Sequence, residues 1–346
     1  MQNPALKFSA LILTLFASAA LLRAQTIVFV GGSGTGHYAS VQLAVNALPS
    51  TGGEIKVEAG TYTGQATITK PNVWLIGQGS SASATVLTAD GSNTTSGSDE
   101  KSATLDVTKT ATGFYASNIQ IQNTYTQEGH TQNQAVALFL YADKSVLRNV
   151  RLIGRQDTLF LGSEGCTSTT CTPARQYIEG SYIEGDVDFV FGDGASVFDT
   201  CTFQIDENQG SIGNETTLTA QNKKFTNYLS GYVLWHSTVN SNPATGMTKD
   251  YLGRPWSALS TVTVVDTSLQ APINAAGWIE FTPGTTNNLP TATYSEYGST
   301  GPGAIGYTNH TRESHAIYLT STQANSYTPD TYLAGSDGWV PTSVSH

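Results

Sequence analysis

Two stretches of the chain decide the fold: VLRNVRLIGRQDTLF (146–160) and YIEGSYIEGDVDFVF (177–191). They match at an offset of 31 residues. Each runs from an apolar pair through a small or polar turn to a second apolar segment, and each carries an aspartate at the same place, Asp157 or Asp188. A unit of about 20–30 residues, with two or three short strands joined by turns, is the size of one coil of a β-solenoid.

The same apolar-turn-apolar pattern occurs six times, ending at residues 121, 152, 183, 203, 239 and 269. The intervals are 31, 31, 20, 36 and 30 residues, and no helical period of 3.6 holds across them. One coil cannot bury its own inward face, so coils must stack. The repeat therefore predicts an all-β fold, a right-handed parallel β-helix from about residue 26 to the C-terminus. Chance similarity among β-rich segments is the alternative.

The first coil of such a stack needs a cover. YASVQLAVNAL (38–48) has the spacing of a short amphipathic helix, with Val41, Ala44, Val45 and Leu48 on one side. We expect this helix to cap the N-terminal end of the β-helix.

Composition agrees with short strands and turns. Of 346 residues 34 are glycine, only 12% are charged and 39% are hydrophobic, so the chain is neither helix-rich nor disordered. The formal charge is −10 and no Lys/Arg cluster occurs, which argues against a nucleic-acid partner. No apolar run after the N-terminal one is long enough to span a bilayer.

The N-terminus is typical of an export signal. A basic residue precedes the mostly apolar run 8–22, and small and polar residues follow it. We expect a secretion signal over 1–24, cleaved after Ala24 or after Ala19, and a single domain over 25–346. A membrane anchor is the alternative.

Export gives meaning to two further features. Asn93, Asn214 and Asn309 each begin an Asn-X-Thr sequon and are candidate glycosylation sites.

Three cysteines are present. Cys166 and Cys171 lie in one Gly/Ser/Thr-rich stretch, GSEGCTSTTCTP (162–173), and are expected to form a disulfide. Cys201 lies in the apolar segment VFDTCTF (197–203) and is expected to be a buried thiol.

The repeat also predicts chemistry. Asp157 and Asp188 lie one coil apart, and equivalent positions on stacked parallel strands are about 4.8 Å apart. Two such carboxyl groups do not both ionise easily, so one pKa of the pair should rise. A charged nucleophile beside a protonated acid is one outcome. A calcium site or a solvated polar ladder is the alternative.

Other hydrolase and cofactor motifs are absent from the sequence. There is no G-x-S-x-G nucleophile elbow, no H-E-x-x-H metal motif and no Walker motif, and GGSGTG lacks the dinucleotide-binding register. We therefore expect neither a metal nor a cofactor.

Together these segments resemble the pectin methylesterases, or pectinesterases, of the secreted fungal type. The resemblance covers nearly the whole mature chain. It begins at VFVGGSGTGHYASVQLAVNALP (28–49), continues through 55–79 and is strongest in four motifs, in this order: QAVALFL (134–140), GRQDTLF (154–160), DFVFG (188–192) and LGRPW (252–256).

The resemblance implies a role for each polar residue of these motifs. Asp188 would attack the carbonyl carbon of a methylated galacturonate. Asp157 would protonate the departing methanol and then activate water. Gln134, assisted by Gln156, would donate to the oxyanion. Arg254 would pair with Asp188 and keep it ionised.

Three aromatic residues of the motifs would line the substrate cleft. Trp256 would offer a flat face to a sugar ring, and Phe160 and Phe191 would lie in the same cleft. Core packing is the alternative for each. The chain departs from the family at Gly64, often an acidic residue, and at Ser181, a cysteine in plant relatives.

These expectations describe a secreted, monomeric aspartyl esterase that acts on pectin. A pectate lyase or polygalacturonase on the same fold is the nearest rival, and a carbohydrate-binding solenoid without activity is the second. Two carboxylates beside glutamines suit an ester carbonyl and its oxyanion better than glycosidic cleavage.

Overall fold

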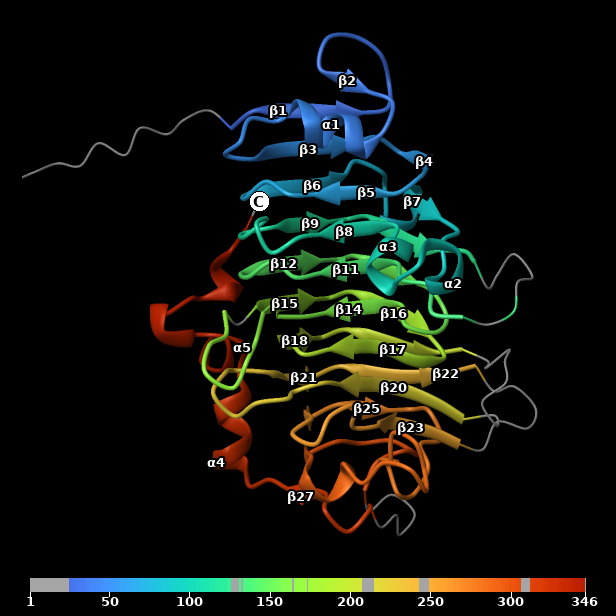
Figure 1. The fold of residues 1–346 in the computed structure, drawn as a ribbon, viewed down its shortest axis with the longest axis vertical. Helices are drawn as coiled ribbons and strands as arrows, with labels where there is room; N and C mark the ends of the chain where they lie inside the picture. The colour runs from blue at the N-terminus through green and yellow to red at the C-terminus, as the bar shows by residue number, and fades with distance from the viewer. Residues whose placement is uncertain are drawn as a thin grey trace, which may run out of the picture.

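The computed structural model describes residues 25–125, 131, 133–163, 165–172, 174–206, 215–242, 249–305 and 312–345. Its coils stack into a right-handed parallel β-helix, as the repeat predicted (Figure 1). The signal segment and the sequons at Asn214 and Asn309 lie outside the described residues.

Three parallel sheets, here named A, B and C, form the walls of the β-helix. In spatial order, sheet A contains β2 (His37–Tyr38), β1 (Ile27–Val30), β3 (Gly53–Val57), β6 (Val73–Gly77), β9 (Tyr115–Ser117), β12 (Ser145–Arg148), β15 (Arg175–Glu179), β18 (Ala195–Asp199), β21 (Gly231–Trp235), β24 (Thr261–Val265), β26 (Thr293–Tyr297) and β27 (Ile317–Tyr318). Sheet B contains β25 (Ser268–Leu269), β22 (Thr238–Ser241), β19 (Thr202–Ile205), β16 (Tyr182–Gly185), β13 (Arg151–Ile153), β10 (Gln120–Asn123), β7 (Thr85–Ala89) and β4 (Gly60–Thr63). Sheet C contains β23 (Lys249–Gly253), β20 (Glu215–Gln221), β17 (Val187–Gly192), β14 (Leu159–Leu161), β11 (Leu138–Leu140), β8 (Leu105–Val107) and β5 (Ala66–Ile68).

The six repeats stack in sheet B in the register that the sequence implies. Their last apolar residues form one continuous row of paired positions, namely Ile121, Leu152, Ile183, Phe203, Val239 and Leu269. These side chains are buried in the main core. Coil lengths differ because loops are inserted outside the strands, such as the one between β14 and β15 that contains Cys166.

The turn within each repeat explains its small or polar residue. The chain passes from sheet A to sheet B through a residue with positive φ. Residues other than glycine adopt this backbone conformation at a cost in free energy. Asparagine, aspartate and glycine tolerate this conformation best, and five of the six positions are polar: Asn118, Asn149, Gly180, Thr200, His236 and Asp266, with φ between 45° and 55°.

The predicted cap helix is present and begins later than expected. Helix α1 spans Val41–Ala47 and buries Val41, Ala44 and Val45 against the first coils. Ser40 is the N-cap of this helix, because its side chain accepts the Leu43 N–H at 3.3 Å.

Short helices connect or cover the coils. α2 (Asn93–Ser96) and α3 (Asp99–Ser102) lie between β7 and β8, while η1 (Ala82–Ala84) and η2 (Leu289–Thr291) occupy other turns. The C-terminal segment holds α4 (Ser321–Ala324), η3 (Asn325–Tyr327), α5 (Pro329–Tyr332), η4 (Gly335–Asp337) and η5 (Pro341–Ser343).

The C-terminal segment runs along the outer face of sheet A and adds no coil (Figure 1). Buried Arg175 of β15 fastens it. The guanidinium binds Asp143 with Nε and Nη2, binds Asp337 at 2.6 and 3.0 Å, and donates to the Leu333 and Ala334 carbonyls. The sequence predicted a β-helix up to the C-terminus, and this is wrong for the last segment: β27 is the final strand of the stack, and the residues after it carry no repeat.

Among the residues that the structure describes, no helix has the length and apolar character needed to cross a membrane.

Candidate active site

Asp157 and Asp188 lie at equivalent places on neighbouring coils. Three residues after each, Phe160 of β14 pairs with Phe191 of β17. The Asp157 N–H also donates to the Val187 carbonyl at 3.0 Å. The coil repeat thus brings the two carboxyl groups together, as the sequence predicted.

Both aspartates have an unusual backbone. Their φ angles are 63° for Asp157 and 51° for Asp188, in the left-handed region that costs free energy for residues other than glycine. The pairing of β17 with β20 also shifts register between Val187 and Val190. Such local strain is common at functional sites, where it directs side chains out of the regular sheet.

Arg254, which follows β23, binds Asp188 with two hydrogen bonds. Nε donates to Oδ1 at 2.8 Å and Nη2 donates to Oδ2 at 2.6 Å. Thr217 Oγ1 donates to Asp188 Oδ1 at 2.6 Å. Both oxygens of Asp188 therefore accept hydrogen bonds, two of them charge-assisted, which favours the ionised carboxylate.

The aspartates open into a cleft of about 240 Å³ over sheet C. The residues that line it are Asp99, Gln134, Gln156, Asp157, Asp188, Phe191, Ala220, Arg254, Trp256 and Phe281. All four polar residues expected to take part in chemistry, and Arg254 with them, thus meet in one cavity.

The environment of Asp157 favours its protonated form. Only 8% of Asp157 is exposed to solvent. Burial raises the pKa of Asp157 well above its usual range, and the charges of Asp188 and Asp99 raise it further, while Arg254 opposes them. The cleft therefore combines a hydrogen-bonded carboxylate with a carboxyl group whose pKa is raised.

The two glutamines are held through their backbones. The Gln134 carbonyl accepts the Asn93 N–H at 2.8 Å, and the Gln156 carbonyl accepts the Ala135 N–H at 3.2 Å. The segments that carry the glutamines are therefore adjacent in neighbouring coils. Both side chains line the cleft beside the aspartates, where an amide N–H can reach an oxyanion.

The aromatic residues divide into two groups. Trp256, 38% exposed, lies at the cleft with its ring parallel to that of Phe281, 6.3 Å between centroids. Phe191 also lines the cleft but is 2% exposed. Phe160 is partly buried, stacks on Phe139 at 3.9 Å and is not among the residues that line this cleft.

Sequence reasoning missed Asp99, Phe281 and Thr217. Asp99 comes from α3 and Phe281 from the loop after β25, and neither lies at a repeat position. Phe281 makes two contacts with Arg254. Its backbone carbonyl accepts a hydrogen bond from Nη1 at 3.0 Å, and its ring centroid lies 4.6 Å from the guanidinium carbon. Thr217 pairs with Val187 in the ladder between β17 and β20, a contact that only the stacked structure reveals.

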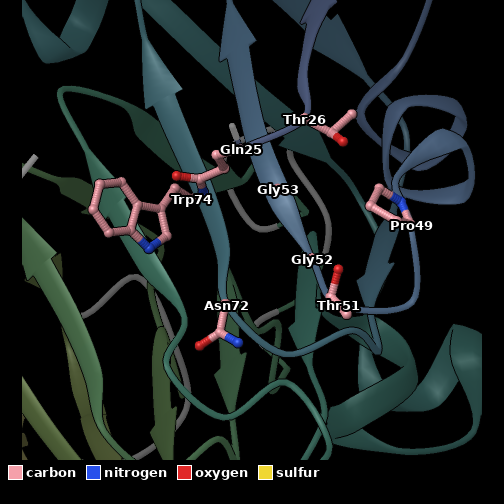
Figure 2. Close-up of a pocket in the computed structure, with 8 residues that line it drawn as sticks. All are labelled: Gln25, Thr26, Pro49, Thr51, Gly52, Gly53, Asn72 and Trp74. Carbon is pink, nitrogen blue, oxygen red and sulfur yellow. The ribbon is translucent and has the colours of Figure 1, made fainter. Parts of the chain in front are cut away.

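A second hollow lies at the N-terminal end of sheet A, and Figure 2 shows its lining. Gln25, Thr26, Pro49, Thr51, Gly52, Gly53, Asn72 and Trp74 line it. None of these eight side chains titrates near neutral pH, so the hollow lacks the acid and base that the cleft over sheet C provides.

The three cysteines and Asn93 are not among the residues that line the cleft, although Asn93 is bonded to two that are, Asp99 and Gln134. Cys166 and Cys171 are bonded to each other in the loop between β14 and β15, and Cys201 is a buried free thiol. Asn93 begins α2, half-buried, and its amide donates to Asp99 Oδ1 at 2.6 Å. Within the described ranges, no three His, Cys, Asp or Glu side chains are grouped as metal ligands.

Comparison with known proteins identifies the family of the chain. The profile of the Pectinesterase family matches residues 27–336. The chain belongs to the pectinesterase family. Among family members, Probable pectinesterase/pectinesterase inhibitor 17 of Arabidopsis thaliana is 31% identical over 320 residues, covering 91% of this chain and 58% of that protein. This chain spans about half the length of several such plant pectinesterases.

Solved pectinesterase structures share the fold. Pectin methylesterase from carrot superposes with a TM-score of 0.77 at 30% identity, covering 90% of this chain and 93% of that one. The enzyme from Aspergillus niger gives a TM-score of 0.69 at 28% identity, covering 85% and 89%.

Proposed function

We propose that this chain removes methyl groups from methylesterified galacturonan, giving pectate and methanol. The observation that carries the proposal is the single cleft in which Asp157, Asp188, Arg254 and two glutamines meet. Membership of the pectinesterase family supports pectin as the substrate.

In the first half of the reaction, a carboxylate oxygen of Asp188 attacks the ester carbonyl carbon. The carbonyl oxygen becomes an oxyanion, to which Gln134 and Gln156 donate hydrogen bonds. As the tetrahedral intermediate collapses, the methoxy oxygen takes the proton of Asp157 and leaves as methanol. An anhydride between Asp188 and the galacturonate remains.

In the second half, Asp157 has lost its proton and serves as the base. It takes a proton from water, whose oxygen attacks the galacturonate carbonyl of the anhydride. Collapse releases Asp188 as a carboxylate and the sugar as a free acid, and Asp157 is protonated again. Arg254 keeps Asp188 ionised at the start and end of each cycle.

Sugar binding is assigned chiefly to Trp256, whose exposed ring can lie against the apolar face of a galacturonate. Phe191 lies beside that ring, at 6.3 Å between centroids, and Phe160 contacts Phe191 edge to face at 5.1 Å. Every step uses carboxyl groups, amides and water, so we propose no metal and no cofactor.

We further propose a secreted monomer, with a signal over 1–24 and one catalytic domain over 25–346. The secreted fungal type is part of this proposal: a solved structure from Aspergillus niger shares the fold at 28% identity, while the carrot structure has the higher TM-score. Asn93, Asn214 and Asn309 remain proposed glycosylation sites, and the Cys166–Cys171 bond can be checked by non-reducing mass mapping.

The decisive experiment measures methanol release and polymer length together on methylated pectin. We expect methanol without chain shortening. Asp188→Asn keeps the shape but is a poor nucleophile, so it should abolish nearly all release. Glu100→Gln, which removes a carboxylate outside the cleft, is the matched control and should remain active. Chain shortening, or near-normal release from Asp188→Asn, would reject the proposal.

A further inference from the structure

A third carboxylate, that of Asp99, lines the same cleft as Asp157 and Asp188. It begins α3 in the connection between β7 and β8, so it reaches the cleft from outside the coil repeat. No step of the proposed ester hydrolysis uses it.

Asp99 is fixed in place by contacts on both sides. Asn93 Nδ2 donates to its Oδ1 at 2.6 Å, and Ser102 Oγ donates to its carbonyl at 2.7 Å. The same Ser102 hydroxyl accepts the Val136 N–H at 3.1 Å, while the Asn93 N–H donates to the Gln134 carbonyl. The two helices are thereby attached to the segment 134–136, and Asp99 is held in a set position relative to the glutamines.

The charges facing Asp157 are unbalanced. Asp188 and Asp186 act on it from the β17 coil, Asp99 from α3, and Arg254 from beyond β23. Arg254 is the one cation among these four groups, and both of its bonds to carboxylate go to Asp188. Asp99 is hydrogen-bonded by a neutral amide, so its charge is not cancelled by that contact.

We propose that Asp99 is a positioning residue that acts through Asp157, keeping the Asp157 carboxyl protonated until the leaving group needs the proton. The inference rests on the proposed function. Once Asp157 has given its proton away, the same negative charge makes it a stronger base toward water. One fixed carboxylate thus assists both halves of the reaction.

The order of causes agrees with this role. Burial and Asp188 raise the pKa of Asp157 most, Asp99 comes next, and the contribution of Asp186 is smaller. Removing the charge of Asp99 should therefore lower the pKa of Asp157, and the proton should be lost at a lower pH.

The test is the pH dependence of kcat/KM for methanol release by Asp99→Asn. We expect its alkaline limb to move to lower pH by about 0.5–1 unit, so that rates on this limb fall about three- to tenfold. Rates at the acidic end should change little. Asp99→Glu keeps the negative charge, so its alkaline limb should lie close to that of the unchanged chain. Asp99→Ser, which removes the carboxylate and keeps a small polar side chain, provides a second charge-free variant.

Glu100→Gln is the control, because Glu100 is the next residue of α3 and faces a separate hollow with Gln65, Thr67 and Asp106. Its limb should not move. An unmoved limb in both Asp99→Asn and Asp99→Ser, with normal methanol release by the unchanged chain, overturns the inference.

An infrared titration of the Asp157 carboxyl band, identified with Asp157→Asn, gives a readout without substrate. Asp99→Asn should shift this titration to lower pH. If the unchanged chain released no methanol, the proposed function would fail, and the titration alone would still decide whether Asp99 controls the proton on Asp157.

Discussion

Arg254 and Asp188 form a two-point contact in which each carboxylate oxygen accepts one N–H, at 2.8 Å from Nε and at 2.6 Å from Nη2. The guanidinium is itself fixed by Phe281, whose carbonyl accepts from Nη1. The planar fork thus sets the direction of Asp188 as well as its charge. A carboxylate with a fixed direction, next to Asp157 whose pKa burial raises, fits the proposed attack by an aspartate on an ester carbonyl.

The first prediction concerns Arg254→Lys, which replaces the planar guanidinium by a compact ammonium group. In Arg254→Lys the cation is kept, but one ammonium cannot bind both Asp188 oxygens with the same geometry. Losing a charge-assisted hydrogen bond costs about 1.5–3 kcal/mol, so kcat for methanol release should fall about ten- to a hundredfold. Circular dichroism should show an intact fold. A normal kcat with a raised KM would mean that Arg254 serves substrate binding alone.

The second prediction concerns the oxyanion. Loss of one donor costs about 2.7–4 kcal/mol, so Gln134→Ala should lower kcat about a hundred- to a thousandfold and leave KM nearly unchanged. Gln134→Glu is a useful companion, because it keeps the size but replaces the donor by a negative group, and it should be no more active. An effect on KM alone would contradict the assignment.

The coil stack was predictable because its cause is local and repeated. Each coil needs an inward apolar residue in register and a turn residue that tolerates positive φ, and both requirements appear at sites such as Leu152 and Asn149. The Asp157–Asp188 pair follows from the same register. The outer C-terminal segment held by Arg175 was not predictable, because its contacts join residues more than 150 positions apart.

Only those residues of the candidate site that stand in the repeat or in a recognised motif could be predicted from the sequence. Asp99 enters from a helical connection and Phe281 from a loop, and neither position shows a pattern in the sequence. Phe160 illustrates the opposite difficulty. Its place in the same motif as Asp157 suggests the cleft, but its ring stacks on Phe139 and it is not among the residues that line the cleft, which only the packed structure shows.

The third prediction concerns metal and pH. Full activity should remain in EDTA, because the proposed steps use only side chains and water. Since the pKa of Asp157 is raised, its proton should persist above the usual range of a carboxyl group and be lost as the pH rises further, which lowers activity on the alkaline side. We expect a mildly acidic optimum. Loss of activity in EDTA, with recovery in calcium, would favour a lyase instead.

The last prediction concerns stability and Asp106 of β8. Its Oδ1 is buried and accepts no hydrogen bond from the residues that the structure describes. Burial, and then the charge of Glu100, raise the pKa of Asp106 to about 7. Between roughly pH 4 and pH 7 the folded chain therefore holds a proton that the unfolded chain has released, so this group makes stability fall as the pH rises.

Asp106→Asn removes that cost, because the amide has the same shape and does not ionise. After allowance for partial solvent screening, the variant should gain about 1 kcal/mol in free energy of unfolding at pH 8 and almost nothing at pH 4. Urea unfolding at the two pH values measures this. Asp90→Asn, at an exposed carboxylate, is the control and should show no such difference. An equal gain for Asp106→Asn at both pH values would mean that its charge does not limit stability.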